Sequence, residues 1–225
     1  MIAAAAHQVG LAELTMKAVA DQLDVSVASL YHHVDGKDDL LRLAAEYSAA
    51  RVRKPTDHGQ HWALWLLEWA THNRESFIAE PELLNQYIEG AISADAMAEN
   101  VNAILGLLVR QGFSIREAQT AYELVSSCAI GSAVQALREQ KALSRGQAPY
   151  GQQQEVLLQR DPSELPYLRL LIAEADDAPP RSFWSRVTTI LAGIAARRGD
   201  SWEDIVRLLE GSGTGVVQAP SAPPP

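Results

Sequence analysis

The side chains best suited to chemistry lie close together between Thr15 and Lys37. Within this stretch the hydrogen-bonding groups are hydroxyls, a phenol and two adjacent imidazoles, at Ser26, Ser29, Tyr31, His32 and His33, with the small Ala28 among them. Small and hydrogen-bonding side chains of this kind suit a helix that enters a DNA major groove, where base edges offer donors and acceptors. The chemistry that this stretch predicts is therefore recognition of DNA by hydrogen bonding.

Two short helices joined by a tight turn must position these groups. Thr15 is a good N-cap for the first helix, whose apolar residues recur at the spacing of one buried stripe. Asp24 and Val25 form the turn, and Ser26 caps a second helix over residues 27–33. An ordinary helical hairpin in a core is the alternative, but it would not need an outer face of Ser, Tyr and His.

The order of residues in this region resembles the tetracycline-repressor (TetR) family of bacterial regulators. The resemblance rests on Leu11, Leu14, Thr15, Ala18, Ala20, Leu23, Val25, Ser29, Leu30, Tyr31, His33, Val34, Lys37, Leu40 and Leu41. It covers about the first 47 residues. It implies a helix-turn-helix whose DNA-binding residues are Thr15, Lys17, Ser26, Val27, Ala28, Ser29, Tyr31, His32, His33 and Lys37, with Thr15, Tyr31 and Lys37 at phosphate-contacting positions.

The charge balance argues against DNA binding if it is taken alone. The 225 residues carry a formal net charge of -9, and residues 1–54 hold six Lys and Arg against seven Asp and Glu, which gives -1. Lys and Arg normally supply much of the affinity for phosphate. Members of the family usually carry a basic arm before the first helix, whereas this sequence starts inside that helix. We expect either that the arm was lost or that the true start lies upstream.

The composition is that of a globular helical protein of the reducing cytoplasm, with 47% hydrophobic residues and one cysteine, Cys128. The single cysteine excludes an internal disulfide and a multi-cysteine zinc site. No signal peptide is evident, and no apolar run approaches the roughly 18 to 20 residues that a membrane span requires.

An enzyme is the main alternative class, and its sequence signatures are missing. We find no Gly-rich phosphate loop after a strand, no nucleophile elbow and no acidic residue paired with His at a metalloprotease spacing. Ser126, Ser127 and Cys128 have the character of core hydroxyls and a small hydrophobe. We expect no catalytic residue, no cofactor and no metal. His58 and His61, beside Asp57, would be candidate metal ligands only if their segment were helical.

Three segments are predicted. Residues 1–47 form the DNA-binding domain, residues 48–210 a larger helical domain for effector binding and dimerisation, and residues 211–225 a disordered tail rich in Gly, Ser, Ala and Pro. A helix over residues 37–53 links the two domains, so it can carry a displacement from one to the other. Residues 142–154, rich in Gly, Gln and Ser, are predicted to be a flexible excursion.

The helix predicted over residues 60–79 is the most informative part of the second domain. Three tryptophans share one apolar arc, and Asn73 falls near its centre. From the residues alone, this arc fits either core packing or the wall of a ligand pocket. The family resemblance implies an effector cavity lined by this helix. The predicted effector-binding set is Trp65, Trp69, His72, Asn73, Met97, Val101, Ile104, Tyr122 and Val125.

Two uncharged helical runs, residues 124–137 and 187–196, cannot offer a normal solvated face to water. Their small residues permit close approach, so we expect a four-helix interface between two copies of the chain. The predicted interface residues are Ser127, Gly131, Val134, Ile190, Gly193 and Ala196.

The sequence as a whole predicts an all-α, homodimeric, ligand-responsive transcriptional regulator, most simply a repressor released from a palindromic operator by a small-molecule effector. The alternative is a helical ligand-binding or interaction protein with weak or no DNA binding, which would explain the acidity but not the turn chemistry at Thr15, Ser26 and Lys37.

Overall fold

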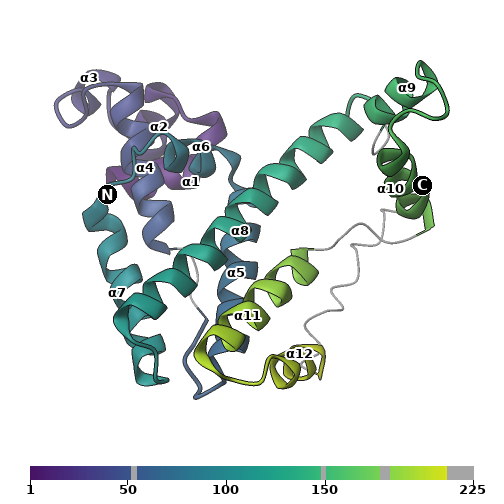
Figure 1. Cartoon of the computed structure of the whole chain (residues 1–225). Coiled ribbons are helices and arrows are strands. Elements are labelled where there is room, and N and C mark those ends of the chain that lie inside the picture. Colours follow the sequence, from purple (N-terminus) through teal and green to yellow (C-terminus); the bar gives the residue numbers. More distant parts are fainter. Residues whose placement is uncertain (52–54, 148–150, 178–182, 212–225) are drawn as a thin grey trace. The chain divides into compact units, whose positions relative to one another are not determined.

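The computed structural model describes residues 1–51, 55–147, 151–177 and 183–211. Every regular element in these ranges is a helix, which confirms the all-α prediction (Figure 1). The chain folds as two compact units, Met1–Ala133 and Val134–Pro225, with the boundary inside one long helix. The domain limits 1–47 and 48–210 stay predictions.

The first five helical elements form the N-terminal part of the first unit. They are α1 (Ile2–Val9), η1 (Leu11–Glu13), α2 (Met16–Leu23), α3 (Val27–Leu30) and α4 (Lys37–Arg51). Both predicted N-caps are present, because Thr15 Oγ1 accepts a hydrogen bond from Ala18 N at 3.0 Å and Ser26 Oγ accepts one from Ser29 N at 3.0 Å. Asp24, in the left-handed region with φ 55°, makes the turn between α2 and α3.

The second helix of this pair is shorter than predicted. It ends at Leu30, and residues 31–33 form a turn in which His32 N and His33 N donate to carbonyls three residues back. Bonds of this type tighten the chain at a helix end. The buried side chains of Leu14, Val19, Leu30, Val34 and Leu40 form the core beneath.

The long connector α4 packs against α1, α6 and α7. Near its C-terminal end the buried Ser48 hydroxyl lies 2.7 Å from Nδ1 of His7 on α1. The His7 ring also lies against Tyr47, at 5.5 Å between ring centroids. Helix α4 is described as far as Arg51, so the last two residues of the predicted 37–53 helix lie outside the described residues.

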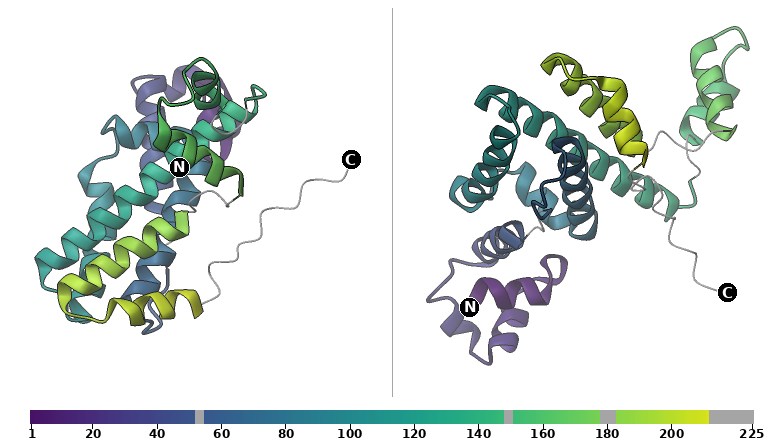
Figure 2. Two further views of the ribbon diagram at one scale, coloured as in Figure 1. Left: turned by 45° about the vertical axis from the view of Figure 1, so that its right-hand side comes forward. Right: turned by 90° about the horizontal axis from the view of Figure 1, so that it is seen from below.

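Four further helices complete the first unit: α5 (Trp62–Ala79), α6 (Pro81–Ile88), α7 (Ala94–Arg110) and the start of α8 (Ile115–Leu143). Figure 2 shows them from two further directions. Helix α8 begins with a capping box, because Ser114 N donates to Glu117 Oε2 at 2.8 Å and Glu117 N donates to Ser114 Oγ at 3.3 Å. The segment before α5 is not helical, so the condition set for a metal site at His58 and His61 is not met.

The second unit contains the end of α8, α9 (Gly151–Leu158), α10 (Pro166–Asp177), α11 (Phe183–Arg198) and α12 (Trp202–Gly211). Arg169 of α10 donates to the carbonyls of Leu157, Arg160 and Asp161, which closes the end of α9. Arg186 of α11 donates to Gln135 Oε1 of α8 at 2.6 Å.

The predicted excursion over residues 142–154 is partly wrong. Helix α8 continues to Leu143, and α9 already begins at Gly151, because the glutamines of this stretch are good helix formers. Residues 148–150, and residues 212–225 of the predicted disordered tail, lie outside the described residues, while Gly211 belongs to α12. No helix in the described ranges is long and apolar enough to cross a membrane.

Candidate functional site

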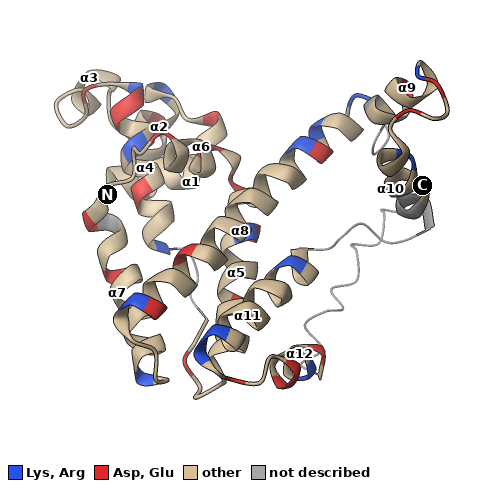
Figure 3. Cartoon of the chain, viewed as in Figure 1, with Lys and Arg blue, Asp and Glu red and all other residues tan. Residues whose placement is uncertain are grey.

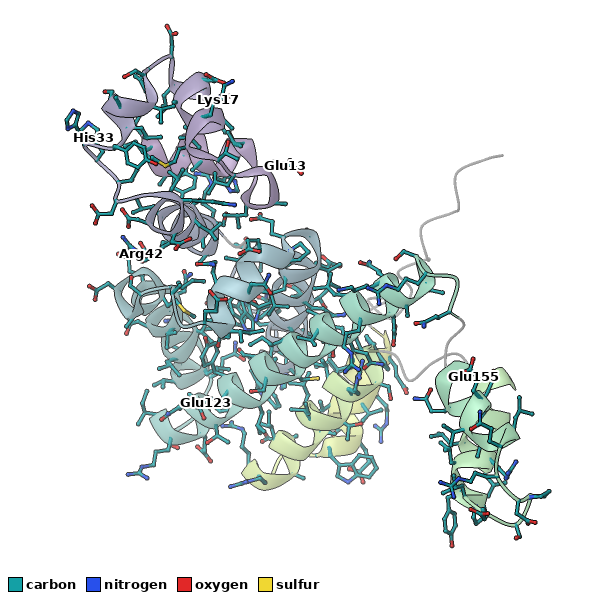
Figure 4. All side chains as sticks on the ribbon, turned by 90° about the horizontal axis from the view of Figure 1, so that it is seen from above. Glu13, Lys17, His33, Arg42, Glu123 and Glu155 are labelled. Carbon is teal, nitrogen blue, oxygen red and sulfur yellow. The ribbon has the colours of Figure 1, made fainter. Side chains whose placement is uncertain are left out.

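The residues predicted to contact DNA lie on α2, α3 and the turn that follows. All except Val27 and Ser29, which are half-buried, are exposed: Thr15, Lys17, Ser26, Ala28, Tyr31, His32, His33 and Lys37. Figure 4 shows His33 projecting outward from the N-terminal helices. The caps at Thr15 and Ser26 fix the start of each helix, so the backbone that carries this face is held by its own side chains.

Basic and acidic residues are interspersed along these helices (Figure 3). Arg42 of α4 is fully engaged, because its guanidinium contacts Asp39 at 2.6 Å and Glu46 at 3.1 Å. The hydrogen bond from Arg42, together with the one from Asp35 N, lowers the pKa of the Asp39 carboxyl. Lys17 and Lys37 are exposed and make no ion pair within the described residues. They are therefore the cations of this face that remain available for phosphate.

A cavity of about 50 Å³ lies inside the first unit. Five helices and the segment between α6 and α7 contribute to it: Ala49 from α4, Trp69, Asn73 and Phe77 from α5, Leu83 and Tyr87 from α6, Ile92, Met97 and Asn100 from α7, and Tyr122, Ser126 and Ile130 from α8. The connector α4 thus supplies part of the cavity wall.

Four of the predicted effector-binding residues line this cavity, namely Trp69, Asn73, Met97 and Tyr122. The other five do not. Trp65 is buried behind Trp69, with the two rings parallel at 6.2 Å, and its indole N–H donates to Pro55 O at 3.2 Å. Ile104 and Val125 are fully buried core residues, and His72 and Val101 are half-buried.

Several lining residues were not predicted from the sequence, and some had a usable signal. Asn100 follows Met97 by three positions, and Ser126 follows Tyr122 by four, so each lies on the same helix face as a predicted residue. Ala49 had no such signal, because an alanine on an amphipathic helix is compatible with any packed surface.

The polar groups of the cavity are few and uncharged. Asn73 is 9% exposed, and its side-chain amide has no hydrogen-bond partner among the described residues. Ser126 Oγ accepts from Trp69 Nε1 at 3.4 Å. Burial, and to a smaller extent Tyr87, raises the pKa of the Tyr122 phenol, so this group is neutral at physiological pH. Among the described residues, no group of three or more His, Cys, Asp and Glu is placed to hold a metal ion.

The residues predicted to meet a second copy lie on outward parts of two helices. On α8, Ser127 and Gly131 are exposed and Val134 is half-buried, while Val125, Ala129 and Ala133 are buried. On α11, Gly193 and Ala196 are exposed and Ile190 is half-buried, while Val187, Leu191 and Ala195 are buried. Each helix therefore has one face in its own core and another face rich in small, uncharged residues.

Two family models match the chain. Residues 2–44 match the bacterial regulatory proteins of the tetR family, and residues 54–198 match the tetracyclin repressor-like C-terminal domain. The helix-turn-helix, the connector and the cavity-bearing helical bundle are the features that such a protein requires. This chain belongs to the TetR family.

Curated relatives carry related descriptions. An HTH-type transcriptional repressor of Mycobacterium tuberculosis, Rv1353c, is 28% identical over 169 residues, 72% of this chain and 64% of the relative. An HTH-type transcriptional regulator of Saccharopolyspora erythraea is 27% identical over 123 residues, 55% of this chain and 52% of the relative. The chain thus matches between half and two thirds of the length of these proteins.

Solved structures share the fold. ActR of Streptomyces coelicolor without ligand superposes with a TM-score of 0.66 at 23% identity, covering 88% of this chain and 97% of ActR. The structure of ActR in complex with actinorhodin gives a TM-score of 0.63 at 25% identity, covering 88% and 96% of the two chains.

Proposed function

We propose that this protein is a transcriptional repressor of the cytoplasm that binds a palindromic operator as a homodimer and releases it when a small molecule enters the cavity. The family, and the descriptions of its relatives as transcriptional regulators and repressors, support this function rather than an enzymatic one. The complex of ActR with actinorhodin supports a small-molecule ligand by analogy.

The observation that carries the proposal is that α4 contacts both the cavity and α1. Ala49 lines the cavity, and the preceding residue, Ser48, is hydrogen-bonded to His7 of α1. A ligand that moves α4 would therefore displace the helices that carry the DNA-contacting face. Such a ligand can shift the equilibrium only by the difference between its affinities for the two arrangements.

Dimerisation gives this displacement its effect on DNA affinity. A two-fold dimer presents two recognition helices to successive major grooves, about 34 Å apart. A tilt of α4 changes their separation without altering any DNA-contacting side chain. The exposed small residues of α8 and α11 are the proposed surface for this pairing, because close helix approach would cover them without burying charge.

The net charge of -9 favours a second candidate, a helical ligand-binding or interaction protein that does not bind DNA. Selection from a randomised double-stranded DNA library separates the two, with gel shifts on the enriched sequences and on the DNA upstream of the protein's own coding sequence. If the protein is a repressor, we expect the selected sequences to contain a palindrome with half-sites one helical turn apart. Recovery of no sequence above background at low salt would favour the second candidate.

A further inference from the structure

The cavity of the first unit has no acidic or basic residue in its lining. None of its twelve lining residues is Asp, Glu, Lys, Arg or His, and nine of them present aromatic or aliphatic side chains. An ionised group that enters such a wall loses its hydration and finds no counter-ion, which is far more costly than burial of a neutral polar group that gains a hydrogen bond.

Aromatic side chains give the wall its shape. Trp69 and Tyr122 lie tilted to one another, with ring centroids 6.4 Å apart, and Phe77 and Tyr87 form a second tilted pair at 5.7 Å. Aromatic rings prefer offset-stacked or edge-to-face contacts, and the rings of both tilted pairs can make such contacts with a flat molecule. A ring system therefore complements these walls better than a branched aliphatic chain of equal area.

One polar group in the wall is positioned without a partner. Asn73 is nine-tenths buried, lines the cavity and makes no side-chain hydrogen bond within the described residues. The Asn73 amide is not among the fully buried polar atoms that lack a partner, so it is accessible from the cavity, where a ligand donor or acceptor can take the place of water. Ser126 is a weaker candidate anchor, because its oxygen already accepts from Trp69.

The present cavity is smaller than a typical ligand site. Its volume of about 50 Å³ compares with roughly 300 to 1,000 Å³ for ordinary small-molecule pockets. Binding therefore has to displace part of the wall, and the flexible Met97 side chain on α7 is the lining residue that can move at least cost.

From these observations we infer that the ligand is an uncharged, ring-containing molecule with a hydrogen-bonding substituent that pairs with the amide of Asn73. The inference rests on the proposed function only in treating this cavity as the effector site. It excludes carboxylates, quaternary or primary ammonium compounds and metal chelates with net charge as preferred ligands.

Calorimetry with three bicyclic probes of equal ring size tests the charge preference at pH 7: neutral 2-naphthol, anionic 2-naphthoate and cationic 2-naphthylmethylammonium. We expect saturable binding of 2-naphthol and at least tenfold weaker binding of both ions. Equal or tighter binding of either ion, or no saturable binding of 2-naphthol within its solubility, would overturn the inference.

Variants locate the anchor. Asn73→Leu should weaken 2-naphthol about fivefold to tenfold, the range of one neutral hydrogen bond, while binding of naphthalene stays within twofold of the parent. Asn102→Leu, on the exposed face of α7, is the matched control and should change neither value. If Asn73→Leu leaves the affinity for 2-naphthol unchanged, Asn73 is not the anchor.

The near-isosteric Asn73→Asp variant keeps the test informative if the leucine variant does not fold. Its new charge should raise the affinity for the ammonium probe relative to the naphthoate, compared with the same ratio in the parent; an unchanged ratio of the two affinities would contradict the assignment. No DNA is present in these binding measurements, so they are independent of the operator experiment. Failure of the operator experiment would therefore leave the ligand class standing, and failure here would leave DNA binding untouched.

Discussion

The hydroxyl of Ser48 lies 2.7 Å from Nδ1 of His7, which joins the end of the connector α4 to the first helix of the chain. Ser48 is 4% exposed, so this contact is made largely out of water. The next residue, Ala49, forms part of the cavity wall. One turn of α4 therefore contacts both the cavity and α1, which packs against α2, and this is the physical basis for the proposed coupling between the cavity and the helix-turn-helix.

Removal of the Ser48 hydroxyl should weaken the contact between α4 and α1. Ser48→Ala leaves the His7 nitrogen without its partner, and we expect a loss of about 1 kcal/mol in the free energy of unfolding. Urea denaturation followed by circular dichroism measures it. Ser144→Ala, at an exposed hydroxyl beyond α8, is the control and should change stability by less than about 0.5 kcal/mol. Equal effects of the two variants would mean that the Ser48–His7 contact contributes nothing.

The two exposed lysines of the proposed DNA-contacting face should set the salt dependence of binding. Lys17→Ala and Lys37→Ala each remove one phosphate contact per subunit, so each should lower the slope of log affinity against log salt by about 2 per dimer. Fluorescence anisotropy from low to moderate salt gives the slope. Lys141→Ala, exposed on α8, should leave it unchanged. A Lys37→Ala slope equal to that of the parent would remove Lys37 from the interface.

A charge on the proposed dimer face should separate the subunits. Gly193 is exposed on α11, and a Cβ added there would meet no described atom within 4 Å beyond its chain neighbours and the adjacent backbone of its own helix, so we expect the monomer to tolerate Gly193→Glu. Burial of two carboxylates in a two-fold interface is costly, and light scattering should report a monomer. Asn102→Glu on α7 should remain dimeric. A dimer in the Gly193→Glu variant would place the interface elsewhere.

The ion pair between Arg42 and Asp39 should give α4 a pH-dependent contribution to stability. Because the pKa of Asp39 is lowered in the folded protein, chiefly by Arg42, the stabilisation is present above the unfolded-state pKa of about 3.9 and is lost as pH falls through the folded value. The stability difference between the parent and Arg42→Gln should therefore be constant near neutral pH and shrink below about pH 4.

Thermal unfolding at several pH values checks this result. The pair is partly exposed, so the effect will be small at moderate salt. Lys141→Gln, which removes an exposed cation of α8 that makes no ion pair within the described residues, serves as the control. A difference between the parent and Arg42→Gln that grew on acidification would contradict the sign.

Local signals explain what the sequence predicted well. The caps at Thr15 and Ser26 act within one turn, so the starts of α2 and α3 follow from the sequence. The shortened α3 was missed because no single residue marks the change from α-helical to tighter bonds at Tyr31.

Packing between distant elements explains the rest. Helical periodicity identifies the apolar arc of α5 but not which part of it meets the cavity and which meets other side chains. Trp65 and Trp69 share that arc, yet only Trp69 lines the cavity, because the Trp65 ring is stacked behind it and bonded to Pro55. Ala49 could not be predicted at all, since its role depends on how α4 crosses helices that follow it in the chain.

The coupling through α4 can be measured with two neighbouring substitutions. Ala49→Leu puts an isobutyl group into the cavity in place of a methyl group and should mimic a bound ligand, whereas Ala50→Leu adds the same group at an exposed position of the same helix. Affinities of the folded variants for the selected palindrome, by gel shift without ligand, are the direct test. We expect Ala49→Leu to bind about tenfold more weakly than the parent and Ala50→Leu to stay within about twofold. Equal affinity of the parent and both variants would contradict the proposed coupling through α4.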